Sequence, residues 1–449
     1  MASDKNKIDV ASDFKLKSLI LFSSTGASVI LTDIMTELNI YEDVFSNNTV
    51  GNILVIDSQN FINRLPIIGH EYLEVSFEKP GAIDNYTKIF RVYKIANRER
   101  TNMQNEQYIL HFTSEEMLLN EQRRVSRSFS GKTISDMVSV IAKDELKIAP
   151  EHLKLTETTE SLHTIVIPNW KPFYAINWLA ARATSSQYPG ASFFFFEDKE
   201  GYKFTSFEAL SQKPAIMTVT VSSRNLTLSP QDAPNELNES QKNIYEYEMK
   251  TGMNILQNLN RGMYAGTLVT VDALRQRIQN HPVGGVSLFN RTKHLNPKSS
   301  FSDMTNRFKK METEEVYSQI ELYPTTDGWN KLSYRALATQ YPNHVEDWLI
   351  QRQMTLAAYH QQRFKISVPG STDITAGKVI DLNFPSLELQ EKAGRKLDEL
   401  YSGKYMVSAV RHSFARSGHI SFLEIMKDSQ EKGFPAAKQD NNLMENLKK

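Results

Sequence analysis

The chain has 449 residues, of which 40% are hydrophobic and 23% are charged, an ordinary composition for a soluble protein of about three domains. Lysine plus arginine equals aspartate plus glutamate at 52 each, and this balance argues against a broad basic surface for nucleic acid. Cysteine is absent, which excludes disulfides, thiolate catalysis and cysteine-based zinc sites.

Residues 18–32 are the one stretch that resembles a membrane or signal segment. Its apolar residues are interrupted by Ser-Ser-Thr-Gly at 23–26, and three early aspartates dilute the basic start that a signal peptide needs. A membrane helix would also need about 20 apolar residues. We therefore expect a soluble, unprocessed chain.

Alternating apolar and polar residues predict β-structure throughout residues 15–112. We expect strands at 17–22, 28–32, 53–57, 71–77, 88–95 and 107–112. The polar residues 1–14 before them are expected to form a flexible N-terminus.

The hydrophobic period becomes helical after residue 112. Ile134, Met137, Val138 and Ile141 share one face of an amphipathic helix, and Thr133 precedes it as a capping residue. This pattern predicts a helix that begins directly after Thr133.

A second helix is predicted to begin near Pro172, since proline suits the first helical position. A hairpin is expected next, with strands at 193–196 and 202–204 around a turn at 197–201. Four consecutive phenylalanines leave the first strand no polar face, so both of its sides should be covered.

The remaining elements are less regular. Strands are expected at 214–221 and 262–272, a long loop at 280–330, a helix at 344–362 and a last β-module at 363–427, and residues 222–260 are polar. Long loops of this kind are uncommon inside compact domains and are often functional or disordered.

A triplet of strands occurs near both ends of the chain. The first comprises 72–77, 90–95 and 108–112, and the second comprises 379–384, 405–410 and 420–425. Their opening segments match by residue class, Leu-Glu-Val-Ser-Phe against Ile-Asp-Leu-Asn-Phe. Two related β-modules indicate a chain that presents one kind of surface twice, as an assembly component does.

Three segments carry a resemblance to a known family. Residues 35–80 contain an amphipathic strand, a turn, a strand ending in aspartate, and then Pro-Ile-x-Gly-x-Glu before another strand. Residues 125–148 and 165–204 add a helical segment and a helix flanked by Pro-x-Trp, followed by an aromatic hairpin. This order of elements resembles the baseplate central hub proteins of contractile-tailed, T-even-type bacteriophages, which are related to the base of type VI secretion spike proteins.

The resemblance implies an α+β, mainly β fold with two tube-type antiparallel β-barrel domains and an intervening mixed domain of helices and a β-hairpin. The first barrel would span residues 15–125, the mixed domain 126–240, and the second barrel 241–285 together with 363–428. The rest would be a long loop or insertion at 286–343, a helix at 344–362 and a polar C-terminal tail at 429–449.

The resemblance also implies a homotrimer that closes a pseudo-sixfold ring in the virion tail baseplate, assembled in the host cytoplasm. That ring would join the sixfold tail tube, or a tube-initiator protein, to the threefold central spike protein. It would frame a channel for phage DNA, which is a partner only in transit. Other baseplate proteins are expected partners, stable membrane insertion is not, and the spike is expected to be a separate protein.

No residue is assigned a catalytic, cofactor-binding or metal-binding role, and no cofactor is expected. The loop 370–378 is too long for a phosphate loop and Val379 replaces its Ser/Thr, so a turn is predicted. The ten histidines lack metal-site spacing, although a site assembled in space stays open. Glu115 and Glu116 could flank a sugar in a glycosidase, but adjacent helical residues point to different sides.

A small basic cluster precedes the first predicted helix, namely Arg123, Arg124 and Arg127. It could contact a phosphate or a partner's carboxylate, but surface ion pairs are the simpler interpretation.

An aromatic group surrounds the second predicted helix and comprises Trp170, Phe173, Tyr174 and Trp178. It could be a carbohydrate platform, a subunit contact or domain core, and core is the commoner role. The alternatives to a non-enzymatic hub are therefore a tail-associated cell-wall hydrolase or a carbohydrate-binding receptor module. Interface residues stay unassigned, because each strand offers two faces.

Overall fold

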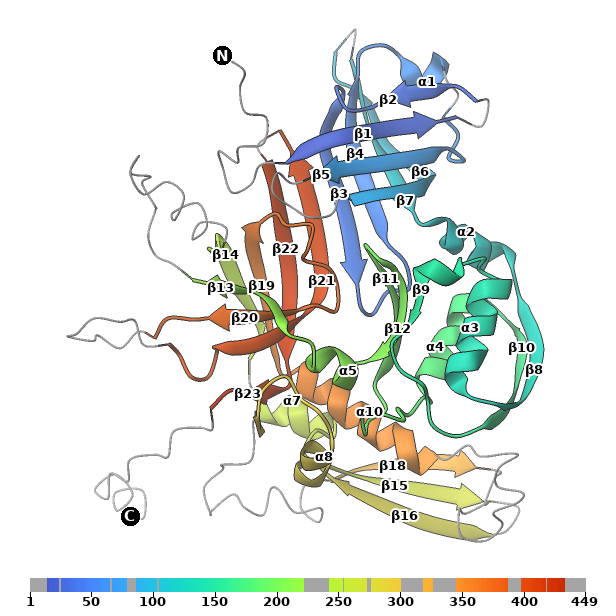
Figure 1. Cartoon of the computed structure of the whole chain (residues 1–449), viewed down its shortest axis with the longest axis vertical. Coiled ribbons are helices and arrows are strands. Elements are labelled where there is room, and N and C mark those ends of the chain that lie inside the picture. The colour runs from blue at the N-terminus through green and yellow to red at the C-terminus, as the bar shows by residue number, and fades with distance from the viewer. Residues whose placement is uncertain are drawn as a thin grey trace, which may run out of the picture.

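The structure is a computed structural model that describes residues 14–23, 26–64, 67–78, 86–102, 105–221, 242–252, 254–272, 276–299, 318–325, 345–386, 397–416 and 418–432. These residues form a mainly β molecule with several helices (Figure 1). This confirms the mainly β class expected from the sequence.

The first lobe is an antiparallel sheet built from the first seven strands. These are β1 (Lys15–Phe22), β2 (Ser28–Ile30), β3 (Met35–Asp43), β4 (Val50–Asp57), β5 (Tyr72–Glu78), β6 (Tyr86–Arg100) and β7 (Glu106–Thr113). Their hydrogen-bonded order is β3-β4-β7-β6-β5-β1-β2. The short helix α1 (Phe61–Arg64) follows β4.

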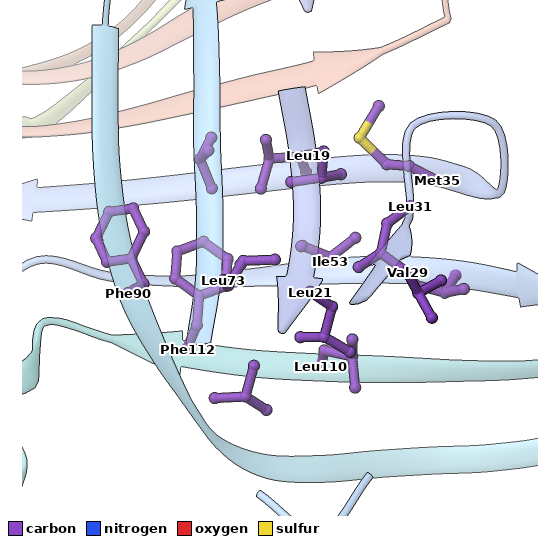
Figure 2. Packing of buried hydrophobic residues seen from close by; sticks show 14 of the residues in the cluster. Leu19, Leu21, Val29, Leu31, Met35, Ile53, Leu73, Phe90, Leu110 and Phe112 are labelled. Carbon is purple, nitrogen blue, oxygen red and sulfur yellow. The ribbon is translucent and has the colours of Figure 1, made fainter. Parts of the chain in front are cut away.

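The inward side chains of these strands form one hydrophobic core (Figure 2). In β4, Ile53 and Val55 are buried, whereas Ile56 is exposed, as the alternation in the sequence predicts. Phe90 of β6 and Phe112 of β7 pack with their ring centroids 4.8 Å apart. The alternating pattern therefore selects the face on which this lobe builds its core.

The second lobe contains the remaining strands of the same sheet. These are β13 (Ala215–Thr220), β14 (Glu246–Thr251), β19 (Gln362–Pro369), β20 (Val379–Asn383), β21 (Gly403–Ala415) and β22 (Gly418–Lys427). Their order is β14-β19-β22-β21-β20-β13, and the β13–β20 pair is parallel. Pairing of β21 with β3 joins the lobes into one 13-stranded sheet.

The two lobes share their strand order. The series β3-β4-β7-β6-β5-β1 of the first lobe matches β14-β19-β22-β21-β20-β13 of the second, position by position. All of these neighbours are antiparallel except β13 and β20, whose counterparts β1 and β5 are antiparallel. The strand triplets noted in the sequence occupy equivalent places, as β5-β6-β7 and β20-β21-β22.

A mixed segment of helices and short strands lies between the lobes in the sequence. It comprises α2 (Glu115–Gln122), β8 (Val125–Lys132), α3 (Ile134–Asp144), η1 (Pro150–His152), β9 (Leu153–Leu155), β10 (His163–Trp170), α4 (Pro172–Ala180), β11 (Phe193–Asp198), β12 (Gly201–Ser206) and α5 (Phe207–Ser211). Strands β11 and β12 form the predicted hairpin, and Phe193, Phe195 and Phe196 are buried. Both predicted helices are confirmed, and Thr133 caps α3 by accepting from the Asp136 N–H.

A small three-stranded sheet lies at the lower end of the molecule in Figure 1, beside α10. Its strands are β15 (Ala265–Asp272), β16 (Arg277–Gly284) and β18 (Ser318–Thr325), and α10 (Val345–Tyr359) packs against it. The neighbouring elements are α7 (Ile255–Asn260), α8 (Gly285–Arg291), β17 (Lys298–Ser299) and β23 (Ser429–Gln430).

Three expectations need correction. Residues 286–343 were expected to be a loop, but their described part holds α8, β17 and β18. Strands β15 and β16 form their own sheet instead of joining the second lobe, which β13 joins by pairing with β20. The tail begins with Ser429 and Gln430, which are buried in β23; residues 433–449 lie outside the described residues, as do 1–13. The positions of β13, β15, β16, β18 and β23 depend on pairing with strands far away in the sequence, which local periodicity does not predict.

The described strand pairs do not close either lobe into a barrel. In the second lobe, an isolated bridge between Thr220 and Asn243 links β13 to the segment before β14. Among the described residues the expected barrels are therefore not closed by paired strands, and the strands form one continuous sheet that is antiparallel except for the β13–β20 pair.

Candidate functional site

The junction between the lobes is a sheet pairing inside one chain. The second half of β21 pairs with β3, with Ala409 opposite Asp43 and Ala415 opposite Glu37. Phe414 of β21 is fully buried in the first lobe's core, 4.3 Å from the ring of Phe77. The two lobes thus share both hydrogen bonds and apolar contacts.

A groove of about 510 Å³ lies over this junction and is lined by residues of β3, β14, β19, β21 and β22. Arg411 lies in its wall and donates from Nε to Asn39 Oδ1 (2.8 Å) and from Nη2 to Glu37 Oε1 (2.9 Å). The hydrogen bond from Asn39 and the nearby Arg411 lower the pKa of Glu37. Arg411 and Glu37 therefore balance each other's charge within the chain.

A cluster of buried charges lies where the first lobe meets the β11–β12 hairpin. Glu197 of β11 accepts from the Thr49 N–H at 2.7 Å and pairs with Lys88 of β6 at 2.5 Å. The adjacent Asp198 is fully buried and pairs with Lys203 of β12. A buried charge is costly unless it has a partner, so the hairpin is stable only where Glu197 meets Lys88 and the Thr49 N–H. The cluster thereby fixes the position of the hairpin on the first lobe.

Glu42 of β3 belongs to the same cluster and connects it to the second lobe. Its carboxylate accepts from the Ala376 N–H at 3.2 Å. Burial, followed by the nearby Asp198, raises the pKa of Glu42 to about 8. The group is therefore mostly protonated at neutral pH, which relieves the desolvation cost of a charge at this position.

The two candidate glycosidase carboxylates face different environments, as expected. Glu115 is exposed beside Arg91, at 3.7 Å, whereas Glu116 is half-buried and accepts from the Tyr202 hydroxyl at 3.1 Å. Burial raises the pKa of Glu116. They do not form a pair across a cleft.

The basic cluster pairs with the end of α3. Arg127 contacts Asp144 at 2.7 Å, Arg123 lies 3.9 Å from Glu145, and Arg124 is exposed. This geometry supports surface ion pairs.

The aromatic group divides between core and surface. Phe173 is buried in the core of the mixed segment. Trp170 lies 5.1 Å from Tyr174 and 5.3 Å from Trp178, and Tyr174 is more than half exposed. Phe173 therefore belongs to the core, Trp170 and Trp178 pack against it while partly buried, and Tyr174 is exposed.

The loop 370–378 is a turn between β19 and β20, as the sequence predicts. Its Ala376 and Gly377 N–H groups donate to Glu42 and to the Val407 carbonyl. Within the described residues, no group of three or more acidic, histidine or cysteine side chains could hold a metal ion.

Sequence reasoning missed the buried charge cluster and the exposed edge of β14. A signal for the cluster is present, since Glu197 and Asp198 directly follow four phenylalanines in a strand. Charges at the end of a fully apolar strand must find partners when that strand is covered. Glu197 finds its partners in β6 and just before β4, and these could not be named without the fold.

Comparison with known proteins places these features in context. The chain is 21% identical over 411 residues to a probable baseplate hub protein, gp334, of Vibrio phage KVP40, covering 88% of this chain and 90% of that protein. No family model matches the chain.

Two solved structures share the fold. A tail protein from Neisseria meningitidis has a TM-score of 0.53 at 11% identity and covers 92% of this chain and 96% of its own. The 43 kDa tail protein of prophage MuSo2 from Shewanella oneidensis has a TM-score of 0.54 at 8% identity and covers 92% and 99%. The chain thus has the fold of these tail proteins and is similar in sequence to a phage baseplate hub protein, which confirms the resemblance found in its sequence.

Proposed function

We propose that this chain is the structural hub of a phage tail baseplate. Its copies form a trimer whose six lobes close a ring between the sixfold tail tube and the threefold central spike. The ring frames a channel for DNA, and the chain has no catalytic role.

The shared strand order of the two lobes is the observation that carries this proposal. A chain with two equivalent lobes presents six similar units when three copies assemble, which lets a threefold object match a sixfold one. The relative named as a probable baseplate hub protein supports the same context. The lobes correspond to the two tube-type domains, here as parts of an open sheet.

The proposed partners follow from this position. One face of the ring contacts the tail tube or a tube-initiator protein, and the other contacts the spike protein, with further baseplate proteins around the rim. Among the described residues, no helix is both long enough and apolar enough to cross a membrane.

Labelling of tail particles tests the position. Gold-conjugated antibodies against this chain should mark one end of tails from the virus or prophage that encodes it. Labels distributed along the tail, or on the capsid, would contradict a hub. Treatment of the particles with denaturant should release the chain together with the spike protein.

A hydrolase role would need a separate test. Glu115 and Glu116 face different environments. We expect no clearing when the purified chain is run in a gel containing peptidoglycan. Clearing that is lost in Glu116→Gln but kept in Glu115→Gln would overturn the non-enzymatic assignment.

A further inference from the structure

The long strand of each lobe changes partner at an equivalent residue. In β6, Arg91 pairs with both Tyr72 of β5 and Thr113 of β7. Beyond Arg91 the β5 ladder has ended. The Val92 N–H still donates to the Glu71 carbonyl, and among the described strands the rest of β6 pairs only with β7.

The second lobe repeats this change. In β21, Met406 pairs with both Val379 of β20 and Met426 of β22. Shortly after these residues, both long strands contain a bulge, at Tyr93 in β6 and at Ser408 in β21. Two lobes with the same partner change and the same bulge are related in detail, since bulges are specific features of a fold.

Beyond the bulge, the two long strands differ in their partners. In β21, residues 409–415 pair with β3, the edge strand of the first lobe. In β6, no strand of the described chain pairs with residues 94–100 on the β5 side.

The matching edge of the second lobe is also open. Strand β14 holds the place that β3 holds in the first lobe, and among the described strands it pairs only with β19. Five of its six residues are exposed, including Tyr247 and Met249. Exposed edge strands are templates for pairing with another chain.

We infer that β14 of one copy pairs antiparallel with residues 94–100 of β6 in the next copy, repeating between chains the β3–β21 pairing within a chain. The occupant of each open edge is thus a second copy of this chain. The contact is head-to-tail, so repeated addition generates a closed ring when the rotation fits. This inference rests on the proposed trimer and names its interface.

The ladders give the register. In the first lobe, Arg91 pairs with Thr113, Thr113 pairs with Val50, and Val50 pairs with Tyr41 of β3. Tyr41 in turn lies opposite Arg411 of β21. In the second lobe, Met406 pairs with Met426, Met426 pairs with Arg363, and Arg363 pairs with Thr251 of β14. Thr251 therefore holds the place in β14 that Tyr41 holds in β3.

Ala96 comes as many residues after Arg91 as Arg411 comes after Met406. Ala96 in β6 is therefore the equivalent of Arg411 in β21. Ala96 of one copy is therefore placed opposite Thr251 of the next.

The charges of the two edges are complementary. Residues 94–100 of β6 carry Lys94, Arg98 and Arg100 against one glutamate, and β14 carries Glu246 and Glu248 against one lysine. Within the chain, Arg98 and Arg100 share Glu106 of β7, and Glu248 contacts Lys250. Antiparallel pairing lays the basic end of β6 along the acidic start of β14. Opposite charges across neighbouring strands stabilise the pair and select this orientation.

Cysteine cross-linking tests the pairing, because the chain has no cysteine of its own. The double variant Ala96→Cys/Thr251→Cys of the full chain should give dimers and covalent trimers on a non-reducing gel after mild oxidation. Each single variant should stay uncross-linked, since a head-to-tail contact does not bring a residue to its own copy. Ile89→Cys/Thr251→Cys is the matched control, because β5 already occupies the edge of β6 at Ile89.

Charge reversal gives a second measurement. Arg98→Glu/Arg100→Glu and Glu246→Arg/Glu248→Arg should each weaken self-association by about tenfold or more, and combining all four changes should restore it. A trimer without the Ala96–Thr251 cross-link, and without charge-swap rescue, would overturn this interface while leaving the trimer intact. A chain that stays monomeric at high concentration and with its spike protein would overturn the trimer as well.

Discussion

Gly51 of β4 occupies a position where no side chain fits. A Cβ there would lie 2.1 Å from Phe112 Cζ and 2.4 Å from the Asn39 carbonyl oxygen. Gly51→Ala should therefore reduce the free energy of unfolding by about 1–3 kcal/mol, as overpacking does in a dense core. Thermal unfolding followed by circular dichroism measures this.

Gly252→Ala is the matched control, because its Cβ would approach only the flexible Met249 side chain, at 3.2 Å. Equal melting temperatures for the Gly51 variant and the parent chain would show that the β3–β4–β7 packing differs from that described here.

The raised pKa of Glu42 should make the free energy of unfolding depend on pH in an unusual direction. Its pKa is raised from 4.5 to about 8 in the fold, so between these two values the native carboxyl holds a proton that the unfolded one has lost. The native state binds more protons, and stability from this group falls as the pH rises through that window, with a limiting slope of about 1.4 kcal/mol per pH unit.

Glu42→Gln keeps the neutral shape and removes the ionisation. The difference in free energy of unfolding between variant and parent should increase in favour of the variant from about pH 5 to about pH 8.5, in denaturant titrations at each pH. The exposed Glu115→Gln is the control and should follow the parent. A constant difference across this range would mean that Glu42 is ionised in the native state.

At the scale of single residues, the sequence predicts which side chains are buried far better than it predicts their hydrogen-bond and ion-pair partners. The cap at Thr133 and the burial of Phe193 and Phe195 follow from local pattern, because a cap and a covered strand are both signalled by neighbouring residues. Glu42 and Glu197 could not be recognised, since their partners Ala376 and Lys88 lie in distant parts of the chain.

At the scale of elements, β21 is the strand that joins the lobes. Phe414→Ala removes a fully buried ring that β21 contributes to the first lobe's core, and should cost about 3–5 kcal/mol. Hydrogen exchange should show faster opening in β1 to β7 as well as in β21.

Phe422→Ala on the neighbouring β22 is the control, because Phe422 is 38% exposed. If Phe414→Ala costs no more than Phe422→Ala, the lobes do not share a core.

Element type was predictable here where element pairing was not. The helices predicted after Thr133 and near Pro172 and the hairpin at 193–204 are observed, because periods of 2 and 3.6 are properties of local sequence. Strands β8, β9 and β10 in the same range were not predicted. The placement of β13 beside β20, and of β15 and β16 in a separate sheet, depends on contacts between strands far apart in the chain and on a strand, β18, within an apparently loop-like stretch.

At the scale of the whole molecule, the duplication seen in two short strand triplets extends to the order of six strands in each lobe. The first lobe's edge strand is covered within the chain by β21, and the second lobe's edge strand β14 is left exposed. A chain with one covered and one open edge of the same kind is suited to add further copies in a ring. The proposed trimer gives each open edge a partner.

Imaging of the purified protein tests this account most directly. Negative-stain class averages, taken with and without the spike protein, should show a threefold ring of six similar lobes around a central hole. Light scattering of the same sample should give three times the chain mass of 51.4 kDa. Single two-lobed particles with the mass of one chain, in both samples, would contradict the account.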